Sequence, residues 1–161
     1  MAPLLKVAAA VVAAVVVVFA AYEVYTMTLQ DVPYTGTVPA SFTVNGRTFA
    51  FTYAATTPAE WSSGLMNTKI TNTTTMLFAF STSSAWTFWM YDTNASLDII
   101  WLKATGDSAR VVYLVTGAPP CYDANACPRY TPTSAANFAI EASAGFASAN
   151  GIAVGTAVAF S

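Results

Sequence analysis

Short apolar runs of strand length, separated by turn residues, follow one another through most of this 161-residue chain. Each run holds aromatic or β-branched residues over about five positions, which is the length and composition of a β-strand. Four such runs occupy the middle of the sequence: Met76–Phe80, Trp86–Met90, Asp98–Leu102 and Arg110–Val115. No segment repeats at a fixed period. The pattern predicts a mainly β domain.

Turn residues predict further strands on both sides of this region. Asn45-Gly46 lies between two alternating apolar runs, which is the strongest short-range signal for a two-residue hairpin. Strands are therefore expected near Phe42–Val44 and Thr48–Tyr53. Towards the C-terminus the sequence predicts a strand over 137–143, a short helix over 144–151 that ends at Gly151, and a turn and closing strand within 152–160.

One helix has a clear start and end in the sequence. Thr57 can be the N-cap, Pro58 suits the first helical position, and Glu60 completes the spacing of a capping box. Gly64 is expected to end this helix after about two turns. The whole pattern predicts a compact single β-barrel or sandwich-like domain with one or two short helices, preceded by an N-terminal hydrophobic helix.

The N-terminus carries an uncharged apolar run, Val7–Ala21, directly after Lys6. Fifteen helical residues rise about 22 Å, which is less than the roughly 30 Å of a bilayer core but typical of the apolar part of a signal peptide. Extension through neighbouring apolar residues would make the segment a membrane anchor. We expect a signal peptide or membrane anchor over 1–22, an extended tether over 23–40 and a β-rich domain over 41–161.

Two further features favour export. Cys121 and Cys127 are the only cysteines, with five residues between them in a loop containing proline, asparagine and aspartate, and a small disulfide ring is predicted. Asn72 and Asn94 begin N-x-[ST] sequences and are candidate glycosylation sites. The predicted location is extracellular, or membrane-anchored at the cell surface, with the membrane as a partner of the N-terminal segment.

The charge inventory excludes several classes of function. The chain has no histidine, which removes Ser-His-Asp and Cys-His catalysis and every imidazole metal site. Charged residues make up 9% of the sequence, compared with roughly 25% in an average soluble domain. The six basic residues are scattered singly, so no basic patch could neutralise several phosphates. Nucleic acid is not predicted as a partner, and neither a cofactor nor a metal is predicted.

Asp98 stands inside an apolar run, between Leu97 and Ile99. Side chains alternate along a strand, so Asp98 would share a face with Ile100 and Leu102. A carboxylate that is at least half buried among such residues needs a partner, because desolvating an unpaired charge costs several kcal/mol. The fold must satisfy this group internally, or a site must use it.

Both interpretations of Asp98 remain open at this point. In the structural one it accepts hydrogen bonds from backbone N–H groups of the Tyr91–Ser96 loop or pairs with Arg110 or Lys103. In the functional one it binds a ligand, or works in a hydrolase with a second acid taken from Glu60, Asp92 and Glu141. The candidate ligand-binding residues are Asp98, Trp89, Trp101, Tyr91 and Asp92, and no catalytic residue is assigned.

The aromatic and methionine side chains could form binding sites or could simply fill the hydrophobic core. Trp61, Trp86, Trp89 and Trp101 could form a ligand platform with nearby phenylalanines, but aromatics at strand spacing more often fill a core. Met66, Met76 and Met90 could bind a soft metal through their thioethers. Without cysteine or histidine beside them they are better explained as gap-filling core residues.

Taken together, six short motifs resemble a known family, the domain of unknown function 192. They occur in its order and spacing between about Phe42 and Phe160: Gly64-Leu65-Met66, Met76-Leu77-Phe78, Phe88-Trp89-Met90, Leu97-Asp98-Ile99-Ile100, the Cys121–Pro128 segment with Tyr130, and Gly151-Ile152-Ala153-Val154-Gly155. The resemblance implies a compact, mostly β domain, often secreted or membrane-tethered in prokaryotes, with no assigned reaction.

The chain departs from this family at three places. Tyr91 and Asp92 follow Phe-Trp-Met where the family commonly has a basic residue and asparagine, and Ser96 stands where a proline is common. The family also commonly has a basic residue soon after Gly-Leu-Met, whereas in this chain residues 67 and 68 come before Lys69. If basic groups line a site in relatives, that site has lost positive charge here.

Three functions are compatible with these features. The first is an exported, non-catalytic domain that binds a small ligand or a partner protein through the face near Asp98. The second is a structural subunit of an extracellular filament or surface assembly, built by packing of anchor helices or by strand addition. The third is a hydrolase that uses Asp98, which the thin supply of acids and the missing histidine disfavour.

Overall fold

The computed structural model describes residues 32–161, of which Pro33–Ser161 form one compact unit. The predicted signal peptide or anchor and the first part of the predicted tether lie outside the described residues. Within residues 32–161, none of the helices has the length and apolar character needed to cross a bilayer.

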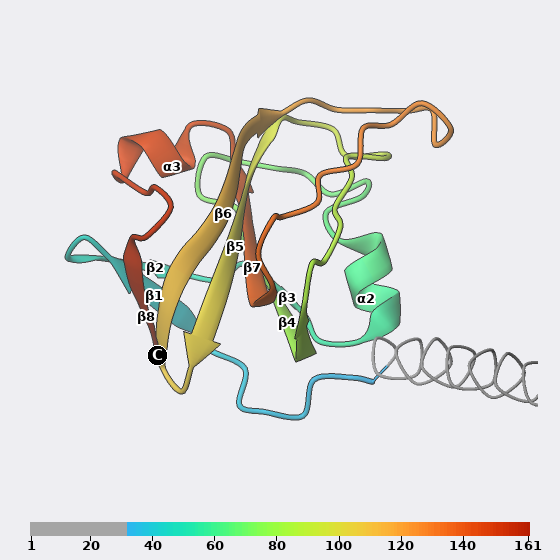
Figure 1. Cartoon of the computed structure of the whole chain (residues 1–161). Helices are drawn as coiled ribbons and strands as arrows, with labels where there is room; N and C mark the ends of the chain where they lie inside the picture. The colour runs from blue at the N-terminus through green and yellow to red at the C-terminus, as the bar shows by residue number, and fades with distance from the viewer. Residues whose placement is uncertain (1–31) are drawn as a thin grey trace, which may run out of the picture. The chain divides into compact units, whose positions relative to one another are not determined.

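The described chain is mainly β, as predicted (Figure 1). The strands are β1 (Ser41–Val44), β2 (Arg47–Ala50), β3 (Tyr53–Ala55), β4 (Thr75–Ser84), β5 (Leu97–Thr105), β6 (Ser108–Ala118), β7 (Ala136–Ser143) and β8 (Ala157–Phe160). The helices are α2 (Pro58–Ser63) and α3 (Phe146–Ala149). All eight strands belong to one sheet in the order β2-β1-β8-β6-β5-β7-β4-β3.

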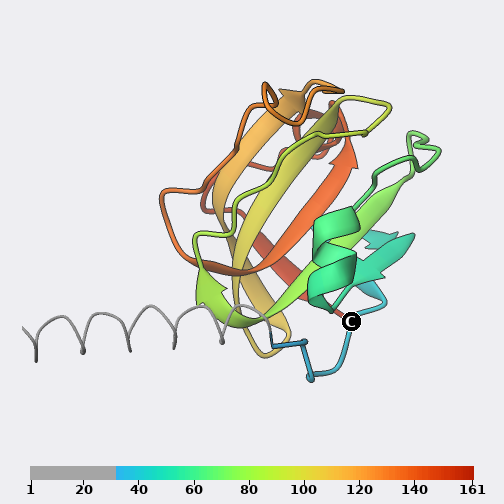
Figure 2. The ribbon, with the colours of Figure 1, turned by 90° about the vertical axis from the view of Figure 1, so that its right-hand side faces the viewer.

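The connection between β2 and β3 explains why this sheet curls. These strands lie at opposite edges of the sheet, but only residues 51 and 52 separate them along the chain. Thr75 ties the edges together, because its backbone oxygen accepts the Thr52 N–H at 2.9 Å and its hydroxyl donates to the Ala50 carbonyl at 2.8 Å. The sheet is therefore a half-barrel whose two edges approach at this point (Figures 1 and 2).

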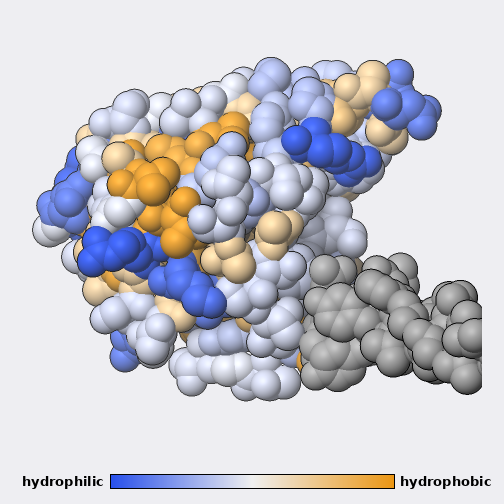
Figure 3. All heavy atoms as spheres, in the orientation of Figure 1, coloured by the Kyte–Doolittle hydropathy of each residue, from blue (hydrophilic) through white to orange (hydrophobic). Residues whose placement is uncertain are grey.

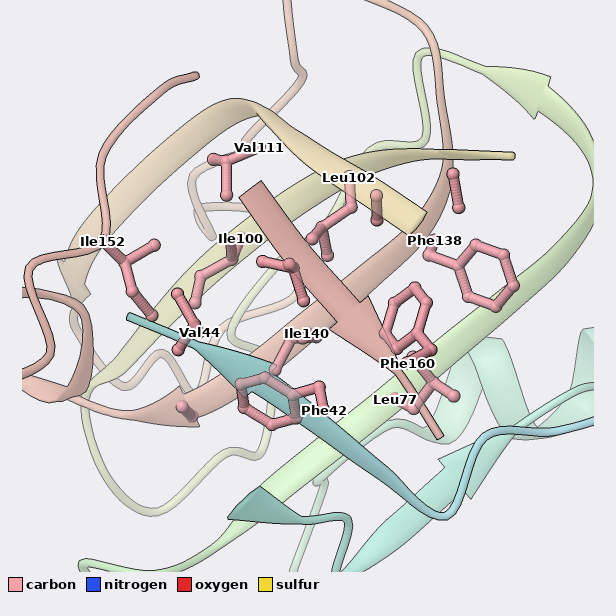
Figure 4. Packing of buried hydrophobic residues seen from close by; sticks show 14 of the residues in the cluster. Phe42, Val44, Leu77, Ile100, Leu102, Val111, Phe138, Ile140, Ile152 and Phe160 are labelled. Carbon is pink, nitrogen blue, oxygen red and sulfur yellow. The ribbon is translucent and has the colours of Figure 1, made fainter. Parts of the chain in front are cut away.

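Buried side chains form one cluster on each face of the curled sheet. In the inner cluster, side chains from β1, β4, β5, β6, β7 and β8 meet inside the curl (Figure 4); among them are Phe42, Val44, Leu77, Ile100, Leu102, Val111, Phe138, Ile140, Val158 and Phe160. The outer cluster includes Leu65, Met76, Phe78, Phe80, Phe88, Met90, Leu97, Ile99 and Trp101, and Trp61 of α2 packs against it. The period-two alternation predicted for Asp98, Ile100 and Leu102 is confirmed, since the two aliphatic residues belong to the inner cluster.

Part of the outer face reaches the surface beside β6. Residues 112–115 of this strand are half-buried: Val112, Tyr113 and Val115 pack against the outer cluster, and Leu114 packs against the inner one. Figure 3 shows apolar residues gathered over this strand, between more polar surroundings. The pairing of β6 with β8 stops at Arg110, so the rest of β6 extends beyond the short closing strand.

Most elements agree with the sequence. The Asn45-Gly46 hairpin is confirmed with φ of 48° and 76° at its two turn residues, as a type I′ turn requires. The capping box at Thr57 and Glu60 is present in full. Two predictions were wrong: the run Thr48–Tyr53 is divided between β2 and β3, and Trp86–Met90 is not a strand. In that segment Phe88 alone makes a bridge, to Tyr130, because the chain crosses over the outer cluster and buries its rings there.

Candidate functional site

Both oxygens of Asp98 are occupied by the protein itself. The side chain is fully buried, with 0% exposure, and its oxygens accept the N–H groups of Gly117 and Ala147, each at 2.9 Å. Gly117 lies where the pairing of β5 with β6 is irregular, and Ala147 lies in the first turn of α3, whose N-cap Gly145 has no capping side chain. The carboxylate therefore holds a β-bulge and caps a helix from another part of the chain.

The partners expected for Asp98 were different. Arg110 instead donates to the Gly155 carbonyl, and Lys103 donates to the Ser83 hydroxyl at 2.6 Å. The hydrogen bonds that the structural interpretation of Asp98 requires are present, but their donors are Gly117 and Ala147, which are distant in the sequence. Its assignment to a ligand site stays a prediction.

The acids proposed to act with Asp98 lie elsewhere. Asp98 is opposite Ala142 on β7 and Glu141 is opposite Ile99 on β5, so the two carboxyl groups point to opposite faces of the sheet. Glu60 is exposed and accepts the N–H groups of Thr56 and Thr57, and the Thr56 bond is the main cause of its lowered pKa. Asp92 lies in a left-handed turn, with φ of 49°. These contacts do not assemble a pair of acids around Asp98.

The other ligand-binding candidates lie on or over the outer cluster. Trp101 is fully buried and donates to the Trp86 carbonyl at 2.8 Å. Trp89 and Tyr91 are half-buried with ring centres 5.1 Å apart, and the Arg129 guanidinium lies 3.7 Å from the Trp89 ring centre. The surface of Trp89 is therefore already occupied by a cation of the same chain. A ligand-binding role for these residues stays a prediction.

Three smaller predictions concern other side chains. The disulfide between Cys121 and Cys127 is present. Asn72 and Asn94 are both exposed, and their glycosylation stays a prediction. Met76 and Met90 are buried in the outer cluster, as expected for core methionines.

A groove opens where the two edges of the sheet approach, and we call it the seam groove. Its cavity volume is about 800 Å³, which is within the range of small-molecule sites. Edge strand β2, the start of β4 and the chain between β7 and α3 surround it; the lining residues are Arg47, Thr48, Phe49, Ala50, Phe51, Thr52, Asn72, Thr73, Thr75, Ser143, Ala144, Gly145, Phe146, Ala149 and Asn150. Phenylalanine rings and hydroxyl groups thus line a single opening.

Aromatic rings from β2, α3 and the connection between β2 and β3 line this groove. The rings of Phe49 and Phe146 have centres 4.9 Å apart in an edge-to-face arrangement, and Phe51 stacks on buried Phe42 at 5.0 Å. Phe49 and Phe51 are half-buried, so they keep part of their surface free for contact. Rings fixed by such packing lose little conformational entropy when an apolar molecule binds.

Arg47 supplies the positive charge at the groove. Its side chain is exposed and its guanidinium lies 5.5 Å from the centre of the Phe49 ring. Among residues 32–161 no carboxylate forms an ion pair with it. The groove therefore combines an apolar floor with a cation that is free to meet an anionic group.

Asn150 adds an unused acceptor to the same lining. Its side-chain amide donates to the Phe146 carbonyl at 2.8 Å, whereas its Oδ1 is buried without a hydrogen-bond partner. Leaving a buried acceptor unpaired costs about 1–3 kcal/mol. A bound water or ion is one way in which a buried acceptor of this kind is satisfied.

Glu141 is the second buried side chain with an unpaired oxygen in the described part of the chain. It is 4% exposed, and its Oε2 has no partner. Burial raises the pKa of this carboxyl from 4.5 to about 8, so it is largely protonated at neutral pH. Perturbed acids of this kind are candidate functional residues when geometry also supports them.

Sequence reasoning named Glu141 only as a possible companion of Asp98. Its signal was the same as that of Asp98, an acid inside an apolar run, but opposite strand faces give the two acids different surroundings. The seam groove had no comparable signal, because its walls come from parts of the chain about a hundred residues apart.

Comparison with known proteins places the chain in a family. Residues 40–160 match DUF192, described as an uncharacterized ACR, and the chain belongs to this family. The resemblance recognised in the sequence motifs is thereby confirmed.

Two solved structures share the fold. A protein of unknown function from Novosphingobium aromaticivorans is 28% identical, with a TM-score of 0.62, over 75% of this chain and 83% of that one. A protein from Sinorhizobium meliloti, whose description proposes a transcription regulator, is 21% identical, with a TM-score of 0.59, over 78% and 98% of the two chains. No curated protein matches the chain.

Proposed function

We propose that this protein is an exported, non-catalytic binding domain that takes its ligand in the seam groove. The observation that carries the proposal is the exposed Arg47 guanidinium beside Phe49, without a carboxylate partner in residues 32–161. The ligand is a molecule with an apolar body and one anionic group. The phenylalanine rings contact its body, and Arg47 binds its charge.

The rest of the groove fits the same ligand chemistry. Threonine and serine hydroxyls in the lining can donate hydrogen bonds to the anionic group. A non-catalytic role is favoured because the lining holds no acid, histidine or cysteine that could act as a base or nucleophile.

We expect Arg47→Gln to weaken binding of an aromatic anion by about tenfold or more, since a hydrogen bond to a charged group contributes roughly 1.5–3 kcal/mol. The probe is 1-anilinonaphthalene-8-sulfonate, which joins an apolar ring system to a sulfonate. Its fluorescence is titrated with the folded, full-length protein in a detergent concentration below micelle formation.

Arg110→Gln is the matched control, because Arg110 is also exposed but does not line the seam groove. It should leave the affinity unchanged. Circular dichroism on each variant confirms that the probe reports on a native state rather than on a loosened core. Equal affinities in the two variants would contradict a binding role for Arg47.

The export part of the proposal rests on the apolar run at the N-terminus and on the disulfide between Cys121 and Cys127. We expect the protein in the membrane or extracellular fraction, accessible to a protease added to intact cells. Protection from the protease until the cells are lysed would contradict export, whereas loss of probe binding would bear only on the groove.

A further inference from the structure

Glu141 lies directly beneath Gly64, on the opposite side of the sheet from Asp98. Gly64 has φ of 47°, and a Cβ atom added to it would lie 3.7 Å from Oε2 of Glu141 and 3.3 Å from the Phe78 ring. Any side chain at this position would therefore be strained and crowded. Gly64 and the Phe78 ring therefore lie next to the carboxyl group.

Gly64 also lines a small surface hollow, which we call the helix hollow. It has a volume of about 300 Å³ and lies between α2 and the β3–β4 edge of the sheet. Its lining residues are Tyr53, Ala54, Ala59, Glu60, Ser63, Gly64, Thr68 and Met76. Gly64 and Met76 connect it to the buried acid, because Met76 is also the cross-strand partner of Glu141.

The charges around the helix hollow have one sign. Glu60 is ionised at neutral pH, because hydrogen bonds to Thr56 and Thr57 lower its pKa, and no lysine or arginine lines the hollow. The last turn of α2 carries no basic side chain to meet the negative end of the helix dipole. Tyr53 is 42% exposed and lines the hollow. An anion is disfavoured here, and a cation is favoured.

We propose that the helix hollow binds a small organic ammonium ion whose charged group pairs with Glu141. Because Oε2 of Glu141 is enclosed, binding requires the Gly64 backbone to move outward, and the ammonium then donates to this oxygen, which has no partner. Its alkyl chain lies against Met76 and Tyr53. This site is separate in residues and in charge from the seam groove.

Ionisation of Glu141 couples this binding to proton release. The acid is protonated at neutral pH, so each ammonium that pairs with it must expel one proton to solvent. The other titratable groups that line the hollow are Glu60, already ionised, and the Tyr53 phenol. On the strands beside Glu141 the facing residues are Met76 and Ile99, which do not titrate. Glu141 is thus the group that must release the proton.

The test is calorimetric titration of the full chain with n-butylammonium chloride between pH 6 and 9. Because only the ionised acid binds the cation, we expect the Kd to fall about tenfold per pH unit up to the pKa of about 8 and then to level. Titrations at pH 6.5 in two buffers of different ionisation enthalpy should give close to one proton released per ion bound. 1-Pentanol, which has similar shape but no charge, should release none.

Glu141→Gln should abolish the proton release and the pH dependence, while Asp107→Asn, a change at an exposed acid in the β5–β6 turn, should preserve both. The proposal is overturned if n-butylammonium binds without proton release, if the Gln variant retains the release, or if no saturable binding occurs at millimolar concentration. Circular dichroism of the Gln variant establishes that it is folded, so a lost signal is assigned to the carboxyl group.

Discussion

Glu141→Gln should make the protein more stable than the wild type at pH 9 by up to about 5 kcal/mol, whereas the two should differ little near pH 4. The carboxyl has a pKa of about 8 in the folded state and an ordinary value of 4.5 in the unfolded chain. At about 1.4 kcal/mol per pKa unit, this difference corresponds to about 5 kcal/mol.

The direction follows from proton binding. Between pH 4.5 and 8 the unfolded chain has released the Glu141 proton and the folded protein has kept it. Folding then takes up a proton, so wild-type stability is highest below pH 4.5 with respect to this group and falls as the pH rises towards 8. Above 8 the folded state holds an ionised, unpaired carboxylate and the loss is complete. Glutamine cannot ionise, so the variant does not lose this stability as the pH rises.

Urea denaturation of both proteins at pH values from 4 to 9 measures this difference, provided that the slopes of the transitions agree. Other titrating groups contribute equally to both proteins and cancel in the comparison. A constant difference across the pH range would show that Glu141 has no raised pKa in the folded state. The same result would remove the proton release expected with n-butylammonium, while binding of the aromatic anion in the seam groove would be unaffected.

The sequence was sufficient for those parts of the fold that depend on local chemistry. The Asn45-Gly46 turn needs positive φ at two residues, and the capping box needs Thr57 and Glu60 at a fixed spacing, so both could be recognised from a few positions. Trp86–Met90 has the composition of a strand but lacks a partner strand beyond one bridge, to Tyr130. Strand composition measures how a segment fills a core as much as how its backbone pairs.

The seam groove and the helix hollow could not be predicted from the sequence, because each is formed by residues that are distant along the chain. Arg47 lines the seam groove because the sheet curls and brings its two edge strands, β2 and β3, close together. Glu141 is next to the helix hollow only because its strand pairs with β4 and because Gly64 ends α2 above it. One acidic residue in an apolar run predicts a buried acid, but the pairing register decides on which face it lies.

Asp98→Asn should destabilise the protein by about 3 kcal/mol or more at neutral pH, because it removes charge-assisted hydrogen bonds that each contribute roughly 1.5–3 kcal/mol. Each carboxylate oxygen accepts one backbone N–H, from Gly117 and from Ala147, at 2.9 Å. An asparagine has one oxygen, so its amide group must face one of these N–H donors. That donor would lose its acceptor in a site with no exposed surface.

The loss should concentrate where the two donors lie. Hydrogen exchange of the Ala147 amide should become faster, because the first turn of α3 loses the acceptor that caps it. Asp107→Asn makes the same chemical change at an exposed position and should alter stability by less than about 0.5 kcal/mol. If Asp98→Asn instead left stability unchanged or raised it, Asp98 would behave as a site residue that trades stability for binding. A clear loss without any ligand present makes it the group that joins β5, the β6 bulge and α3 into one scaffold.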